Sequence, residues 1–182
     1  MDESEKITPP ITPQQLTEAV ELMFFVYRDF ISDPDKLLAE HGFGRAHHRV
    51  LHFIGRQPGL SVAELLDILA ITKQSLARVL RDLLQAGYVQ QTMGQHDRRK
   101  RLLTLSPKGH RLHAQLLAPQ QKRFLRAIAK SERGTVEAWR NFMLQLVNPD
   151  NQANILRHIE QNHPEQNHPE QDHPMQTTYN DR

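Results

Sequence analysis

Polar side chains gather on one face of a helix that is predicted to begin at Thr72. Threonine is a favoured helix-capping residue. At about 100° per residue, one narrow arc gathers Gln74, Arg78, Arg81 and Gln85, with Asp82 at its edge. The candidate contacts on this helix are Thr72, Lys73, Gln74, Ser75, Arg78 and Arg81. Arginine and glutamine match the hydrogen-bonding edges of guanine and adenine. This face therefore predicts a reader of the DNA major groove.

The opposite face of the same helix is apolar and predicts burial. Its residues follow helical spacing: Leu76, Val79, Leu80, Leu83 and Leu84. A second predicted helix, capped by Ser61, precedes it and carries its own apolar stripe. Only residues 70–72 connect the two helices, which is the spacing of a helix-turn-helix.

A basic loop follows, between two predicted strands at residues 88–91 and 101–105. The loop and the start of the second strand carry Asp97, Arg98, Arg99, Lys100 and Arg101. A hairpin tip with paired arginines is narrow enough to enter a minor groove, where the negative potential favours arginine. Asp97 is expected to hold an arginine guanidinium through paired hydrogen bonds. The strands and loop predict a DNA-binding wing.

Charge is strongly partitioned along the 182-residue chain, although the net charge is only +2. Residues 73–111 carry nine basic and two acidic side chains, whereas residues 1–40 carry three basic and nine acidic ones. A concentrated basic segment of this kind is typical of proteins that bind the phosphate backbone. The alternative is a basic face that serves only solvation.

Several of these segments resemble a known family. Residues 71–89 (ITKQSLARVLRDLLQAGYV), 96–101 (HDRRKR) and 105–109 (LSPKG) resemble the winged helix-turn-helix signature of MarR-type bacterial transcriptional regulators. Residues 43–51 (FGRAHHRVL) are similar to its PetP-type branch. The resemblance spans residues 13–147. It implies a homodimer, a pseudo-palindromic operator, a small ligand that loosens DNA binding, and a wing pairing of Asp97 with Arg99.

The expected fold is mainly α with a small β wing: a winged helix-turn-helix DNA-binding lobe plus a helical dimerisation layer. Three segments are predicted: a flexible arm at 1–12, a MarR-type domain at 13–147 and a disordered tail at 148–182. Within the domain, the DNA-binding lobe is expected at 45–106 and the dimerisation helices at 13–40 and 107–147. The tail is rich in histidine, proline and glutamine and contains a five-residue repeat.

The predicted dimerisation helices contain two prolines. Pro34 is expected to break the first helix, between a segment at 13–31 and a short one at 36–40. The first of these segments has two apolar faces, of which one suits this chain's own core and the other suits a second subunit. Pro119 is expected to kink or interrupt the long helix that begins at Pro107. A last helix is predicted at 135–147.

Aromatic and polar side chains are expected to line a cleft between the dimerisation helices and the DNA-binding lobe. These residues are Tyr27, His41, Phe43, Arg45, His47, Phe53 and His113. The set suits a small, planar, aromatic and anionic effector. Two histidine pairs suggest a second reading, a zinc-responsive regulator, because His48 with His52 and His110 with His113 stand at spacings that can share an ion.

Other function classes find little support in the residues. The chain has no cysteine and shows no P-loop, G-x-S-x-G, H-E-x-x-H or dinucleotide-binding glycine motif, so no enzyme, cofactor or metal site is predicted. An RNA-binding winged helix would present aromatic side chains for stacking, and the polar arc has none. The longest apolar run, residues 22–27, is too short to span a bilayer, and no leader pattern is seen. A cytoplasmic protein that binds double-stranded DNA is expected.

Overall fold

The computed structural model describes residues 11–94 and 100–161. These residues form two compact units, which divide between Glu132 and Arg133. The first unit contains α1 (Pro13–Glu40), α2 (Arg45–Arg56), β1 (Leu60–Ser61), α3 (Val62–Leu69), α4 (Lys73–Gln85), β2 (Val89–Met93), β3 (Arg101–Leu105) and α5 (Pro107–Ile128). The second contains α6 (Thr135–Leu146) and α7 (Pro149–Gln161). The helices α6 and α7 thus belong to one unit, and the expected domain boundary at 147 stays a prediction.

The core of the first unit lies beneath the helix-turn-helix. Leucine and isoleucine side chains from α2, α3, α4 and β3 are fully buried there, among them Leu51, Ile54, Leu65, Leu83 and Leu103. These positions are the apolar stripes of the amphipathic helices, so the periodicity in the sequence correctly predicted the buried faces. The mainly helical fold with a small sheet is confirmed.

Local capping explains where the two helices of the helix-turn-helix begin. The Ser61 hydroxyl accepts a hydrogen bond from the Glu64 N–H, and the Glu64 carboxylate accepts one from the Ser61 N–H, which completes a capping box. The Thr72 hydroxyl likewise accepts from the Ser75 N–H at the start of α4. Residues 70–72 form the predicted connection, with Ala70 in the left-handed region at a φ of 49°.

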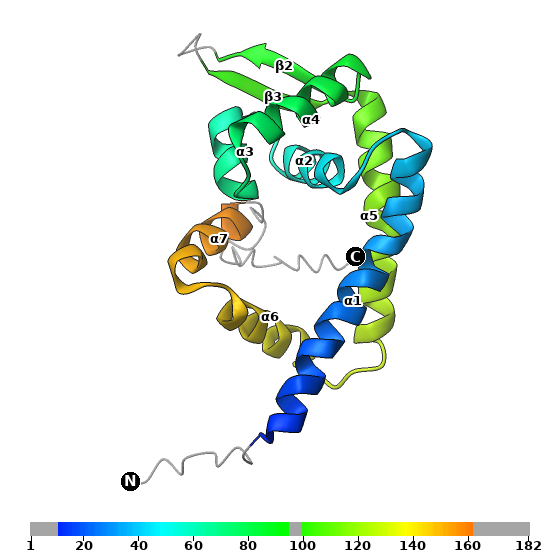
Figure 1. The fold of residues 1–182 in the computed structure, drawn as a ribbon, viewed down its shortest axis with the longest axis vertical. Helices are drawn as coiled ribbons and strands as arrows, with labels where there is room; N and C mark the ends of the chain where they lie inside the picture. Colours follow the sequence, from blue (N-terminus) through cyan, green and yellow to red (C-terminus); the bar gives the residue numbers. More distant parts are fainter. Residues whose placement is uncertain (1–10, 95–99, 162–182) are drawn as a thin grey trace, which may run out of the picture. The chain divides into compact units, whose positions relative to one another are not determined.

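Three antiparallel strands form the wing sheet in the order β1-β3-β2. The β2–β3 ladder pairs Val89 with Leu105 and Met93 with Arg101. Figure 1 shows this hairpin at the top of the unit, beside α4. The short strand β1 was not predicted, because two residues are too few to show the alternation of a strand.

The expected break at Pro34 is wrong, because α1 runs without interruption from Pro13 to Glu40. Proline removes one helical hydrogen bond, a cost of about 3 kcal/mol in a helix interior. Here Pro34 and Leu38 are buried, and α1 packs along α2 and α5 (Figure 1). Burial against neighbouring helices offsets the lost bond. The helix α5 is likewise continuous through Pro119, so no break occurs there.

The expectation of disorder from residue 148 is wrong as far as Gln161, because residues 149–161 form α7. Pro149 suits the first turn of a helix, and Ile155, Leu156 and Ile159 stand at helical spacing and are partly shielded from solvent. The Gln152 amide also donates to the carbonyl oxygens of Leu144 and Val147, at 2.9 and 3.3 Å. The five-residue repeat and most of the predicted arm at 1–12 lie outside the described residues.

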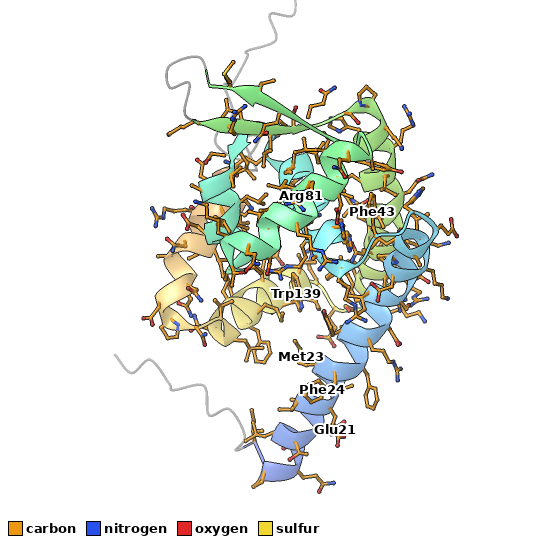
Figure 2. The ribbon with its side chains drawn as sticks, turned by 45° about the horizontal axis from the view of Figure 1, so that its top comes forward. Glu21, Met23, Phe24, Phe43, Arg81 and Trp139 are labelled. Atoms are coloured by element: carbon orange, nitrogen blue, oxygen red, sulfur yellow. The ribbon has the colours of Figure 1, made fainter. Side chains whose placement is uncertain are left out.

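The amino-terminal half of α1 exposes both of its apolar faces. Met23 and Phe24 are labelled on this half of α1 in Figure 2, and Phe24 is 69% exposed. The exposed apolar side chains of α1 include Leu16, Val20, Leu22, Met23, Phe24, Phe25, Val26 and Tyr27. One face was expected to be covered by this chain's own core, yet only the carboxyl-terminal part of α1, around Pro34 and Leu38, is buried. Both faces are therefore exposed in the first unit.

Candidate DNA-binding interface

The polar face of α4 is exposed as the sequence predicted. The helix runs across the unit in Figure 2, where Arg81 is labelled. A shallow hollow along this face is lined by Gln74, Ser75, Ala77, Arg78, Arg81 and Asp82. Thr72 and Lys73 are also exposed at the start of the helix. Since the apolar face of α4 is buried in the core, the two arginines cannot turn inward without unpacking the helix.

Two of the predicted wing residues lie at the end of the β2–β3 hairpin where the two strands are connected. Lys100 and Arg101 are exposed where β3 begins, and the Gly94 N–H donates to the Lys100 carbonyl at 3.0 Å. The predicted contacts Asp97, Arg98 and Arg99 lie outside the described residues. The expected pairing of Asp97 with an arginine therefore stays a prediction.

A hydrogen bond between α2 and α4 supports α4, the second helix of the helix-turn-helix and thus its recognition helix. The Nε2 atom of His47 lies 3.2 Å from an oxygen of Asp82, and the Gly44 N–H donates to Nδ1 of the same ring at 3.1 Å. Because Nδ1 accepts, the proton of the neutral ring is on Nε2 and is donated to Asp82. His47 thus supports the arginine-bearing face of α4.

Three residues predicted for the effector cleft form an aromatic cluster instead. Phe43 stacks on His47 with ring centroids 4.7 Å apart, and Tyr88 meets Phe43 edge-on at 5.2 Å. The Tyr88 hydroxyl lies 3.2 Å from Nδ1 of His41. This cluster ties the α1–α2 connection to the end of α4. Sequence spacing could not place these rings, because the connection at residues 41–44 has no periodicity.

The start of α5 is anchored to the end of α4 by Ser106 and Lys108, which were not predicted as functional residues. The Ser106 hydroxyl donates to the Gly87 carbonyl at 2.7 Å and accepts from the Gly109 N–H at 3.0 Å. The Lys108 ammonium donates to the Ala86 carbonyl and lies 4.1 Å from the Tyr88 ring centroid. The Leu-Ser-Pro-Lys-Gly motif therefore fixes the end of the recognition helix.

A second hollow, of about 450 Å³, lies within the first unit between α1, α2 and α5. It is lined by Tyr27, Phe30, Ile31, Arg45, His48, Arg49, His52, Phe53, Leu117, Gln120, Gln121 and Phe124. Of the residues predicted for an effector cleft, Tyr27, Arg45 and Phe53 line it, whereas His41, Phe43, His47 and His113 do not. The walls are mainly apolar and aromatic, and none of the lining residues is acidic.

Two arginines supply the positive charge of this hollow. Arg45 pairs with Asp35 at 2.9 Å, and its guanidinium lies 5.9 Å from the Tyr27 ring centroid. Arg49 donates to the carbonyl oxygen of Leu69 at 2.8 Å. Burial lowers the pKa of His48, although Asp35 partly opposes the shift, so this imidazole is neutral at pH 7. The hollow can therefore accept an anion beside aromatic surface.

The histidine pairs considered for zinc are rearranged by the tertiary structure. His52 of α2 and His113 of α5 face each other across helices, with ring centroids 5.5 Å apart. No group of three or more histidine, aspartate or glutamate side chains suited to a metal ion is found in the described residues. The described residues therefore do not support the hypothesis of a zinc-responsive regulator.

Acid should destabilise the protein through His113. Burial, followed by the nearby His110, His48 and Arg56, lowers the pKa of His113 below its ordinary value of 6.5. The His113 imidazole therefore binds a proton more readily in the unfolded chain than in the folded protein. The free energy of unfolding keeps its full value above about pH 6.5 and decreases as the pH drops toward the pKa of the folded state. We expect His113→Gln to flatten the fall in melting temperature between pH 7 and 5. Equal slopes for both proteins would contradict this.

A helix-turn-helix with an arginine-bearing second helix, followed by a β hairpin, defines a winged-helix DNA-binding protein. The model of the MarR family matches residues 41–100. The HTH-type transcriptional regulator PetP of Rhodobacter capsulatus is 42% identical over 139 residues, which cover 76% of this chain and 84% of that protein. The chain belongs to the MarR family and is a DNA-binding transcriptional regulator.

Solved structures show the same fold at low sequence identity. Staphylococcus aureus MarR in complex with salicylate and kanamycin matches with a TM-score of 0.60 and 22% identity, over 74% of this chain and 91% of that one. Streptococcus pneumoniae FabT in complex with DNA matches with a TM-score of 0.60 and 16% identity, over 74% and 94%. No helix among the described residues is long and apolar enough to cross a membrane.

Proposed function

We propose that this protein is a repressor that binds a pseudo-palindromic operator as a homodimer and is released by a small anionic ligand. The observation that carries the DNA-binding part is the exposed face of α4, where Gln74, Arg78 and Arg81 stand over a buried apolar stripe. The related fold of FabT, solved with DNA, supports the same use of this lobe. Repression needs only occupancy of the operator.

The homodimer is inferred from apolar surface that the described chain leaves uncovered. Both faces of the first half of α1 are exposed, and so are Leu125 and Ile128 at the end of α5. Many exposed apolar side chains on one helix are characteristic of an interface. A two-fold dimer presents two copies of α4, so its operator would have two related half-sites about one helical turn apart.

The ligand part of the proposal rests on the hollow between α1, α2 and α5. Its volume of about 450 Å³ is within the range of small-molecule sites. Aromatic walls and two arginines favour a planar molecule with a carboxylate. Such a ligand would act by binding better to the arrangement of α2 that does not fit DNA.

Arg78→Ala tests base reading by α4. We expect it to weaken binding to a selected operator by roughly 1 to 3 kcal/mol and to relax base preference at one position, because a bidentate contact to a base edge is lost. The measurement is a fluorescence-anisotropy titration on operators selected from genomic fragments, with every base pair of one half-site varied.

Arg157→Ala on α7 is the matched control, because it removes the same charge outside the helix-turn-helix. It should leave the operator affinity unchanged. If Arg78→Ala loses as much affinity on random DNA as on the operator, Arg78 contacts only phosphate and the assignment of base reading to it is wrong.

A further inference from the structure

Arg49 contacts both the hollow between α1, α2 and α5 and the carboxyl end of α3. Its side chain lines the hollow between α1, α2 and α5, and its Nη2 atom donates to the Leu69 carbonyl oxygen at 2.8 Å. Leu69 is the last residue of α3, and residues 70–72 then lead directly into α4. A single guanidinium therefore connects the proposed ligand site to the turn that orients the recognition helix.

We propose that Arg49 is the residue through which an anionic ligand in the hollow controls the helix-turn-helix. The inference rests on the proposed ligand function and adds to it a specific relay. A carboxylate in the hollow takes the guanidinium of Arg49 away from the Leu69 carbonyl. The carboxyl end of α3 then loses a bond from outside the helix, and the turn before α4 is freed to shift.

The charges around the hollow favour Arg49 over Arg45 as the ligand's partner. Arg45 already has a carboxylate, that of Asp35, at 2.9 Å. Arg49 has no carboxylate partner in the described part of the chain, and its observed acceptor is a neutral carbonyl. Hydrogen bonds between an arginine and a carboxylate are stronger than those to a neutral acceptor, and they are often bidentate. An arriving carboxylate therefore competes well with the Leu69 carbonyl.

The turn that Arg49 holds is one that depends on outside support. Ala70 adopts a left-handed conformation at a φ of 49°, which is unfavourable for a residue with a side chain. Within the turn, the Ala70 N–H donates to the Leu66 carbonyl at 2.9 Å. A strained conformation persists only when its surroundings hold it. Loss of the Arg49 bond therefore loosens this turn more than it would an ordinary helix end.

Two residues of α2 contact the helix-turn-helix at different points, so their effects on DNA binding can be measured separately. The helix α2 packs against α1, α3, α4 and α5. His47, which is not part of the hollow's lining, contacts Asp82 of α4, whereas Arg49 contacts the end of α3. Removal of His47 should therefore weaken DNA binding with or without a ligand. Removal of Arg49 should instead reproduce the effect of the ligand, so that operator binding is weaker from the start and changes little when the ligand is added.

The test measures how much salicylate, used as a planar aromatic carboxylate, weakens operator binding by the full-length protein. In the wild type, saturating salicylate should raise the melting temperature and weaken operator binding by about tenfold or more, within the usual range of allosteric coupling. Arg49→Gln should reduce this weakening to less than about twofold. His47→Gln should bind the operator less well but keep the wild-type weakening factor. Arg157→Gln should behave as the wild type.

Amide hydrogen exchange at residues 70–76 supplies a readout that does not depend on DNA. Salicylate should speed exchange there in the wild type, and Arg49→Gln should exchange fast without it. If Arg49→Gln does not fold, Arg49→Lys replaces it and should also lower the weakening factor, because one ammonium cannot reproduce the forked contact.

Two results would overturn the relay, and they differ in what they say of the ligand site. If salicylate stabilises the wild type and weakens operator binding equally in Arg49→Gln, the site stands and the relay is wrong. If salicylate neither stabilises the wild type nor affects operator binding, the proposed anion site is wrong and the relay falls with it.

Discussion

Phe25→Glu is expected to leave the protein a monomer of 21.1 kDa and to lower its operator affinity by more than about a hundredfold. Phe25 is 52% exposed on α1, beside the equally exposed Leu22 and Val26. In the proposed dimer this surface is buried, and a glutamate there would carry an unpaired charge into an apolar interface. Two half-sites bind tightly because the second contact is intramolecular. A monomer loses that advantage.

Light scattering at micromolar concentration measures the mass, and an anisotropy titration measures the affinity. The wild type should have twice the chain mass. Gln14→Glu is the matched control, since it adds the same charge to α1 at an exposed polar position. It should remain a dimer. A wild-type protein that is monomeric yet binds one operator tightly would show that the exposed faces of α1 do not pair two copies.

Gly109→Ala is expected to destabilise the fold by about 1 to 3 kcal/mol or more, the cost of overpacking a filled site. A Cβ atom at Gly109 would overlap the Tyr88 carbonyl oxygen and would lie 3.3 Å from the Cβ of Leu105. The obstacle is backbone, which cannot swing aside. The Tyr88 carbonyl also accepts the Ser106 N–H at 3.0 Å, so its displacement would disturb the anchor between α4 and α5.

Urea denaturation of the two proteins gives the free energy of unfolding. Gly44→Ala is the control, because no atom lies within 4 Å of its added Cβ and its φ of −131° is ordinary. Its loss should be well under half of that of Gly109→Ala. Similar losses would mean that the contact of α5 with Tyr88 is looser than the structure implies. Operator affinity of Gly109→Ala, measured well below its melting temperature, should also fall.

The residues that line the hollow between α1, α2 and α5 show how far the sequence pattern alone could predict its walls. Tyr27, Arg45 and Phe53 were predicted for it and line it, because they stand on helices α1 and α2, whose periodicity can be read from the sequence. His41 and Phe43 lie in an irregular connection, whose direction the sequence pattern does not specify. Their rings pack against Tyr88, a residue more than forty positions away. Arg49 was not assigned to the hollow because its role depends on the position of Leu69.

The sequence by itself determined the helix-turn-helix, the polar face of α4 and the two strands of the wing hairpin, β2 and β3. These features depend on interactions within a few residues, such as the caps at Ser61 and Thr72 and the spacing of leucines. Only the tertiary structure decided that α1 continues through Pro34, that Gly109 must lack a side chain, and that Arg49 reaches the end of α3. In each case the deciding contact joins distant parts of the chain, so its free energy is absent from any local pattern.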